Sequence, residues 1–194
     1  MKLKETAKNI NEYIRKWSEG KQKLVVAVDG YTGVGKTTIL DALAELNSDI
    51  LPVHCDDFML SAAEFKKILA LNEDRSVTFE LHRNDYGKIE DMVNAFRKRN
   101  DTVELHVANR ETGKTDVTKT FELSKSIMVI EGVFMFHPKL LDHLWDKRIY
   151  LDGDTVTIDE RRVKREKERW GDKYFPETHP DLLCRKHPVS PRYA

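Results

Sequence analysis

The chain has 194 residues, the size of one globular domain with room for a small inserted lobe. Its 33 lysines and arginines balance 33 aspartates and glutamates, so the formal net charge is zero. That balance argues against a sequence-independent nucleic-acid coat and against a protein held to membranes by basic patches, because both need a net positive surface.

The N-terminus and the cysteines indicate a compartment. No apolar run approaches the ~18 residues of a membrane span, and the first ten residues lack the apolar core of a signal peptide. Two cysteines, Cys55 and Cys184, are too few for a disulfide framework. We therefore expect a cytoplasmic protein with reduced thiols, folded as a single domain over residues 1–194.

Apolar patterns predict helices and strands in alternation. Helices are expected over residues 3–19, which make up most of an N-terminal helical segment 1–20, and over residues 37–47, 62–71, 88–99 and 139–145. Strands are expected over residues 23–29, 50–54, 126–130 and 148–151. The chain between residues 71 and 88 is expected to be irregular. Two β-rich runs, 102–107 and 115–121, predict a hairpin. Because a hairpin interrupts the alternation, residues 102–121 are predicted to form a small lobe on an α/β fold with a parallel sheet.

The C-terminal part differs in composition. Thr157 followed by Glu160 forms a capping box that predicts a helix start at about Ile158. The segment 155–173 has almost no apolar stripe, so it is expected to project from the domain or to move. Residues 175–194 contain four prolines and are expected to form an irregular tail.

The glycine-rich loop after the second predicted element carries the strongest signal. Residues 30–37 read G-Y-T-G-V-G-K-T and match G-x-x-x-x-G-K-[ST] in full. Such glycines let backbone N–H groups converge on phosphate oxygens, and the following helix N-terminus adds partial positive charge. Lys36 supplies a cation for the β- and γ-phosphates, and the Thr37 hydroxyl is placed to bind Mg²⁺. The expected nucleotide-binding residues are Gly30, Thr32, Gly33, Val34, Gly35, Lys36, Thr37 and Thr38.

The phosphate motif alone is compatible with GTPases, ATPases and small-molecule kinases. An N-K-x-D guanine signature is absent, which argues against a GTPase, and motor ATPases usually have longer chains. Glu131 follows the apolar run 127–130, at the strand end where these folds hold magnesium. The alternative for Glu131 is an ordinary solvated carboxylate.

Two adjacent acids, Asp56 and Asp57, follow the second predicted strand. A kinase needs a carboxylate that orients the acceptor hydroxyl and takes its proton. The alternative is a pair that caps the next helix. Phe58 is then either a wall of the acceptor pocket or part of the core.

A zinc cluster is the other chemistry that this stretch suggests. His54 and Cys55 precede the acid pair, and Cys184 and His187 lie near the C-terminus. No C-x-x-C or H-E-x-x-H spacing supports such a site, so we do not expect zinc.

The charges are unevenly distributed along the chain. Residues 161–173 contain seven lysines and arginines against three acids, whereas residues 39–80 contain nine acids and three bases. A run of this kind usually forms a solvated helix face. Phosphoryl transfer, however, needs cations near the γ-phosphate and exclusion of water, so we interpret the basic segment as an arginine lid.

Taken together, these motifs resemble the phosphoribulokinase/uridine kinase family of P-loop small-molecule kinases. The matching stretches are Val28–Thr38, Asp56-Asp57-Phe58, Val129–Val133 and Arg161–Glu166. Uridine kinases carry D-x-F after the second strand, E-G after a later strand and an R-R-x-x-R-D lid. The resemblance implies a three-layer P-loop fold of the NTP-hydrolase type, with ATP and Mg²⁺ as cofactors. It also implies transfer of the γ-phosphoryl group to a hydroxyl of a small molecule.

The resemblance implies roles for individual residues as well. Asp56 would be the catalytic base, assisted by Lys36, while Thr37 and Glu131 would serve Mg²⁺. The implied lid cations are Arg161 at the nucleotide and Arg162 and Arg165 at the transferring group. The hairpin 102–121 would lie over the acceptor. ATP and the acceptor are the implied partners, and a homo-oligomer is compatible with the family.

The sequence departs from the family pattern in the acceptor site. Uridine kinases have H-P-D-A-F-D, whose acids hold the ribose, where this chain has H-R-N-D-Y-G over residues 82–87. Val103 and Ala108 stand where the family places Tyr and His against uracil. A pocket without those donors should not discriminate strongly for uracil. The expected acceptor-site residues are Asp57, Phe58, His82, Asp85, Tyr86 and Arg110.

Three functions therefore remain open. The preferred one is a uridine kinase-like enzyme that acts on a nucleoside. The second is a kinase for another acceptor, such as pantothenate, a sugar or nicotinamide riboside, whose kinases look similar through Asp56-Asp57-Phe58 and residues 131–145. The third is a regulatory protein that binds nucleotide without catalysis.

Overall fold

The computed structural model describes residues 2–98, 101–109 and 111–171. The chain forms two compact units, Met1–Asp152 and Gly153–Ala194. Within the described residues, no helix is long and apolar enough to cross a membrane. The elements of the first unit are α1 (Lys2–Ser18), β1 (Leu24–Gly30), α2 (Lys36–Leu46), β2 (Ile50–His54), η1 (Cys55–Phe58), α3 (Ala62–Leu71), α4 (Arg75–His82), α5 (Tyr86–Lys98), β3 (Thr102–Val107), β4 (Val117–Glu122), β5 (Ile127–Glu131), η2 (Asp142–Leu144) and β6 (Lys147–Leu151).

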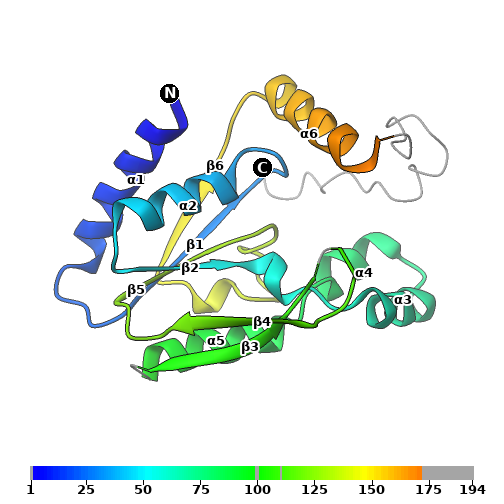
Figure 1. Cartoon of the computed structure of the whole chain (residues 1–194), viewed down its shortest axis with the longest axis horizontal. Helices are drawn as coiled ribbons and strands as arrows, with labels where there is room; N and C mark the ends of the chain where they lie inside the picture. Colours follow the sequence, from blue (N-terminus) through cyan, green and yellow to red (C-terminus); the bar gives the residue numbers. More distant parts are fainter. Residues whose placement is uncertain (1, 99–100, 110, 172–194) are drawn as a thin grey trace. The chain divides into compact units, whose positions relative to one another are not determined.

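A four-stranded parallel sheet organises the first unit (Figure 1). The strand order is β2-β5-β1-β6, so β1 pairs with β5 on one side and β6 on the other. His54 at the end of β2 is in register with Glu131 at the end of β5. Parallel strands share one carboxyl edge, and ligands in such folds bind in the crevice at that edge.

Both faces of the sheet are covered, which makes three layers. On one face α1 and α2 pack against Leu24, Val26 and Val28 of β1. On the other, α5 and the β3–β4 hairpin pack against Val25 and Ala27. Successive residues of β1 thus enter opposite cores, which explains why the strand reads as an unbroken apolar run. Figure 1 shows the hairpin and α5 together below the sheet. The predicted α/β fold with a parallel sheet and a hairpin insert is confirmed.

Two predictions in the first unit are wrong. The segment expected to be irregular contains α4, whose N-cap, Asp74, accepts hydrogen bonds from the amides of Ser76 and Val77. The helix predicted over residues 139–145 is only the short 3-10 helix η2. Its apolar residues are buried because the chain packs on the core, where the Trp145 indole N–H donates to the carbonyl of Met135.

The second unit contains one described helix, α6 (Thr155–Trp170). It begins about three residues before the predicted start, and its N-cap is Asp154 instead of Thr157. The Asp154 carboxylate accepts hydrogen bonds from both the amide and the hydroxyl of Thr157, at 2.8 and 2.7 Å. A carboxylate at the N-cap also favours the positive end of the helix dipole. The predicted tail 175–194 lies outside the described residues.

Candidate functional site: a phosphate loop beside a strand-end carboxylate

The phosphate loop connects the end of β1 to the start of α2. Gly30, Gly33 and Gly35 all have positive φ angles, a conformation that glycine adopts without steric cost. The N-cap of α2 is Gly35, which offers no side chain to the first-turn amides, so these amides are suited to bind an anion. Lys36 is buried, and its Nζ donates to the carbonyl oxygens of Gly30 at 2.7 Å and Tyr31 at 3.3 Å. The loop therefore holds its lysine inside a ring of backbone groups.

Other predicted members of the loop have different surroundings. Thr32, Thr37 and Thr38 are exposed. Val34 is buried, so only its backbone is suited to contact a phosphate.

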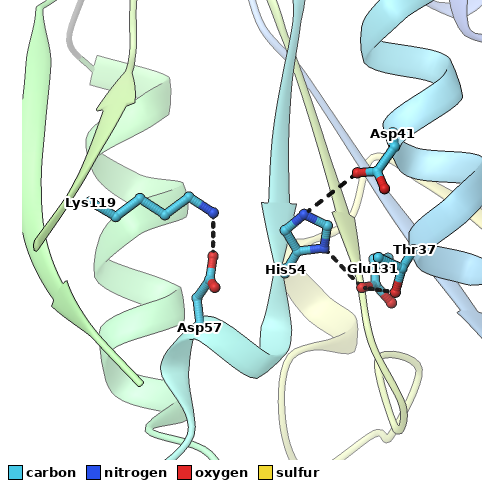
Figure 2. A network of polar contacts seen from close by, with 6 residues as sticks. All are labelled: Thr37, Asp41, His54, Asp57, Lys119 and Glu131. Atoms are coloured by element: carbon cyan, nitrogen blue, oxygen red, sulfur yellow. Dashed lines mark hydrogen bonds and ion pairs between the residues drawn. The ribbon is translucent and has the colours of Figure 1, made fainter. Parts of the chain in front are cut away.

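Glu131 stands beside the first turn of α2, as Figure 2 shows. Its Oε1 accepts a hydrogen bond from the Thr37 hydroxyl at 3.0 Å and lies 3.0 Å from the Nδ1 of His54. Burial alone would raise the pKa of Glu131, but the hydrogen bonds from His54 and Thr37, with the charge of Lys36, outweigh it and lower the pKa. Glu131 is therefore a carboxylate at neutral pH, although it is only 5% exposed.

The pair Thr37–Glu131 has the donor chemistry of a magnesium site. Mg²⁺ prefers oxygen ligands and is commonly bound by one or two protein groups together with substrate phosphates and water. Within the described part of the chain, no group of three or more His, Cys, Asp or Glu side chains could hold a metal ion. An ion at Thr37 and Glu131 would thus take its remaining ligands from phosphate and water, which fits a nucleotide-bound Mg²⁺.

The sequence suggests no role for His54 other than that of a zinc ligand, and the structure gives it different neighbours. Its Nε2 lies 3.9 Å from Oδ1 of Asp41 on α2, and its Nδ1 contacts Glu131. The hydrogen bond to Glu131 is the main reason that the pKa of His54 is raised, and burial opposes it. The strand order places His54 beside Glu131. The sequence alone does not reveal that β2 and β5 are neighbours, so it gives no sign of this contact.

Asp56 and Asp57 lie in η1, directly after β2. The Asp57 carboxylate accepts a hydrogen bond from Nζ of Lys119 on β4 at 2.6 Å, and its backbone carbonyl accepts one from the amide of Ala108 at 2.8 Å. Asp57 therefore fastens the hairpin to the end of β2 (Figure 2). Lys119 is a second residue that the sequence analysis missed. It lies on the face of the hairpin that carries Leu105 and Phe121, which the β3–β4 register reveals.

We expect the ion pair between Lys119 and Asp57 to be measurable in a double-mutant cycle. Lys119→Met and Asp57→Asn each remove one partner, and both side chains are partly exposed, at 35% and 20%. The coupling free energy should be about 1 kcal/mol, because a partly buried charged hydrogen bond contributes more to stability than an exposed ion pair does. Equilibrium unfolding in urea of the four proteins measures it. Lys114→Met, an exposed hairpin substitution, is the control, and additive effects would contradict the pairing.

Phe58, one of the expected acceptor residues, belongs to the core. It is 2% exposed and stacks on Phe121, with ring centroids 6.3 Å apart. Of the two roles that the sequence left open for Phe58, the structure thus gives the core role. The neighbouring Cys55 is also buried, and the amide of Asn84 donates to its sulfur at 3.1 Å.

The thiol of Cys55 should be unreactive in the native protein. Burial, reinforced by nearby acids such as Asp56 and Glu131, raises its pKa well above the ordinary value. Because the thiolate is the reactive form, labelling with an aromatic disulfide at about pH 8 should be at least ~100-fold slower than in denaturant. Cys184→Ser leaves Cys55 as the single thiol. Fast labelling of the native variant would contradict this burial.

The segment 82–86 packs directly against η1. The amide of Leu60 donates to the carbonyl of Arg83, and that of Asp85 donates to the carbonyl of Phe58. Asp85 caps α5 by accepting the amide of Lys88 at 3.0 Å, and the Tyr86 hydroxyl donates to the Glu80 carbonyl at 2.9 Å. His82 is exposed at the end of α4. Arg110 lies outside the described residues.

Two further charged residues near this edge, Asp29 and Arg83, were not predicted as site residues. Asp29 is the penultimate residue of β1, and its carboxylate accepts hydrogen bonds from the amides of Gly30 at 2.6 Å and Phe136 at 3.4 Å. Burial raises its pKa, and these amides and Lys36 oppose the rise without cancelling it. Arg83 is half-buried, with its guanidinium 5.0 Å from the ring centroid of Phe65. Burial lowers the pKa of Arg83, and the charge of Asp56 acts in the opposite direction.

The predicted lid arginines share one helix. Arg162 pairs with Asp159 at 3.1 Å and Arg165 with Glu166 at 3.5 Å, while Arg161 is exposed. They belong to the second unit, and their role as a lid stays a prediction.

Comparison with known proteins places these features in a family context. The model of the phosphoribulokinase/uridine kinase family matches residues 25–175. A uridine kinase from Bacillus subtilis (strain 168) is 26% identical over an alignment of 155 residues, and the match covers 76% of this chain and 69% of that protein. A bifunctional alpha-galactosidase/sucrose kinase from Mediterraneibacter gnavus is 22% identical over an alignment of 183 residues. The match covers 86% of this chain and 19% of that protein. The solved structure of a possible uridine kinase from Bacillus stearothermophilus superposes with a TM-score of 0.65 at 19% identity, over 91% of this chain and all of that one, which supports the fold.

Proposed function

We propose that this chain, which belongs to the phosphoribulokinase/uridine kinase family, is a kinase that transfers the γ-phosphoryl group of ATP to a hydroxyl of a small molecule. One observation carries the proposal. The phosphate loop, the strand-end Glu131 and the acid pair of η1 all follow parallel strands whose carboxyl ends meet at one edge of the sheet. This shared edge supports the proposal that the phosphate loop, a metal-side carboxylate and a candidate base serve one site.

The residues of the site divide the work of phosphoryl transfer. The amides of the loop and Lys36 bind the phosphates, and Thr37 with Glu131 would hold Mg²⁺. A bound Mg²⁺ supplies charge neutralisation at the phosphate oxygens. Asp56 orients the acceptor hydroxyl and takes its proton as the new P–O bond forms and the bond to ADP breaks. Arg162 and Arg165 stabilise charge on the transferring group, and Arg161 binds the nucleotide.

A nucleoside is the acceptor that the family relation favours, and a sugar is the second candidate. The hairpin has Val103, half-buried against the core, at the position expected for a base-reading residue. One relative is a bifunctional alpha-galactosidase/sucrose kinase, which supports a sugar as the second candidate. Asp57, His82, Asp85, Tyr86 and Arg110 are the proposed contacts to the acceptor.

An acceptor panel tests this proposal on the full chain. ADP formation is followed with Mg²⁺ and ATP in the presence of uridine, cytidine, nicotinamide riboside, pantothenate, fructose or sucrose. The kinase should release ADP faster with one class, and mass spectrometry should find the phosphorylated acceptor. If MgATP binds but no acceptor accelerates ADP release, a nucleotide-binding regulatory protein becomes the better description.

A further inference from the structure

We propose that His54 is a positioning residue, which fixes the Glu131 carboxylate so that it can serve a nucleotide-bound metal ion. The inference rests on the proposed function, because it assigns His54 a role within the same site. Among the described residues, the polar contacts of the His54 ring are with Asp41 and Glu131, and none is with the glycines or Lys36 of the phosphate loop. It acts through Glu131.

The geometry gives the carboxylate a defined orientation. Two hydrogen bonds from different elements, Thr37 on α2 and His54 on β2, converge on the same oxygen, Oε1, each at 3.0 Å. Among the residues that the structure describes, no hydrogen bond to Oε2 is seen, so this oxygen remains available to a metal-bound water. A glutamate at a strand end could otherwise adopt several rotamers, and each would place the charge differently.

The imidazole is itself held on both sides. Its Nε2 lies 3.9 Å from Asp41, which is one helical turn after Thr37 and therefore on the same face of α2. The backbone of His54 is in register with that of Glu131 in the sheet. With Nδ1–H donating to Glu131, the ring joins β2, β5 and α2. Figure 2 shows His54 between Asp41 and Glu131, with the Asp57–Lys119 pair on its other side.

A support of this kind has a known size of effect. Partners that orient metal-binding groups through hydrogen bonds typically change metal affinity by 10–100-fold when they are removed. The role predicts a loss confined to the metal-dependent part of nucleotide binding. A histidine that only fills space would affect folding, and would affect binding with and without metal equally.

The test measures ATP binding by calorimetry over a series of Mg²⁺ concentrations and in EDTA, which needs no acceptor. His54→Ala should raise the Mg²⁺ concentration for half-maximal effect by about 10–100-fold and leave the affinity in EDTA within about twofold. His54→Asn should recover most of the loss, because its Nδ2 can take the place of the imidazole Nδ1 donor. His54→Gln, whose donor sits one bond further out, should recover less. His143→Ala, an exposed histidine that pairs with Glu90, is the matched control.

The outcomes separate this inference from the proposed function. If the wild-type chain does not bind MgATP, the proposed function fails and the inference fails with it. If wild type binds MgATP but His54→Ala leaves the Mg²⁺ dependence unchanged, the inference alone is overturned. If His54→Ala does not fold, by circular dichroism, the comparison of Asn and Gln decides. Equal Mg²⁺ dependence in those two variants would overturn the role.

Discussion

Replacing Asp56 by asparagine is expected to lower kcat by about 10²–10⁴-fold, the usual contribution of a positioned general base. The asparagine amide keeps the size of the side chain but cannot accept the proton of the acceptor hydroxyl. Asp56 lies in η1 at the carboxyl edge of the sheet, whereas the phosphate loop lies on β1 and α2. The dissociation constant for MgATP should therefore stay within about twofold of wild type. Steady-state kinetics with the acceptor found in the panel, and calorimetry with MgATP alone, measure the two quantities.

Asp57→Asn is the control for this experiment, because the two acids are adjacent and only their surroundings differ. Asp57 forms a 2.6 Å ion pair with Lys119, so its carboxylate serves to fasten the hairpin to the end of β2. Its replacement should raise the KM for the acceptor more than it lowers kcat. If Asp57→Asn loses kcat and Asp56→Asn does not, the base has been assigned to the wrong acid.

The fold could be predicted where a pattern had a single interpretation. The apolar run of β1, the glycine-rich loop and the apolar face of α2 follow one another directly, and together they predict a strand, a phosphate loop and a helix. The strand β5 ends in a glutamate, as expected. Helix α4 was missed because Val77 and Phe79, two positions apart and nearly half exposed, form no apolar stripe of helical spacing. Only the N-cap, Asp74, signalled it. The start of α6 was misplaced because Asp154 competes with Thr157 as a cap, and the carboxylate prevails.

The candidate site was predictable residue by residue but not as a network. Lys36, Thr37 and Glu131 follow from motif and strand-end position. The contact of His54 with Glu131 requires the knowledge that β2 and β5 are neighbours, which no local pattern contains. Lys119 likewise requires the hairpin register. Asp85 was expected at the acceptor, which stays a prediction; its capping of α5 was not foreseen, although a short acid before a helix often accepts the amides that the helix leaves open.

The charge distribution follows from the same arrangement. The acids between residues 39 and 80 include Asp41, Asp56 and Asp57, which surround the end of β2. Cations from other segments interact with some of these acids. Lys119 forms an ion pair with Asp57, and Arg83 interacts electrostatically with Asp56. A carboxylate that must activate a hydroxyl beside the phosphates of ATP requires such compensation, because an uncompensated cluster of acids would repel the nucleotide.

Gly30→Ala is expected to cause a large loss of stability, larger than that of Gly35→Ala in the same loop, whose added Cβ would meet only side-chain atoms of Leu3. Gly30 has φ +151° and is in register with Leu151 of β6. An added Cβ would collide with the carbonyl oxygen of Leu151 and come within 3.2 Å of Val34 Cγ1. Because the carbonyl belongs to the backbone of a paired strand, it cannot rotate away. Overpacking and the unfavourable φ together should lower the free energy of unfolding by at least about 3 kcal/mol.

Gly87→Ala on α5 is the matched control for that substitution. Its added Cβ would meet only Asp85 Oδ1, at 3.6 Å, an ordinary contact, and alanine favours a helix over glycine by roughly 0.5–1 kcal/mol. Urea unfolding followed by circular dichroism should therefore order the proteins as Gly30→Ala, wild type and Gly87→Ala, from least to most stable. MgATP binding should weaken in Gly30→Ala and persist in Gly87→Ala, since the displaced backbone of residue 30 also carries the carbonyl that holds Lys36. A Gly30→Ala protein as stable as wild type would show that β1 and β6 can separate at their ends, which would remove the steric reason for glycine at the first position of the loop.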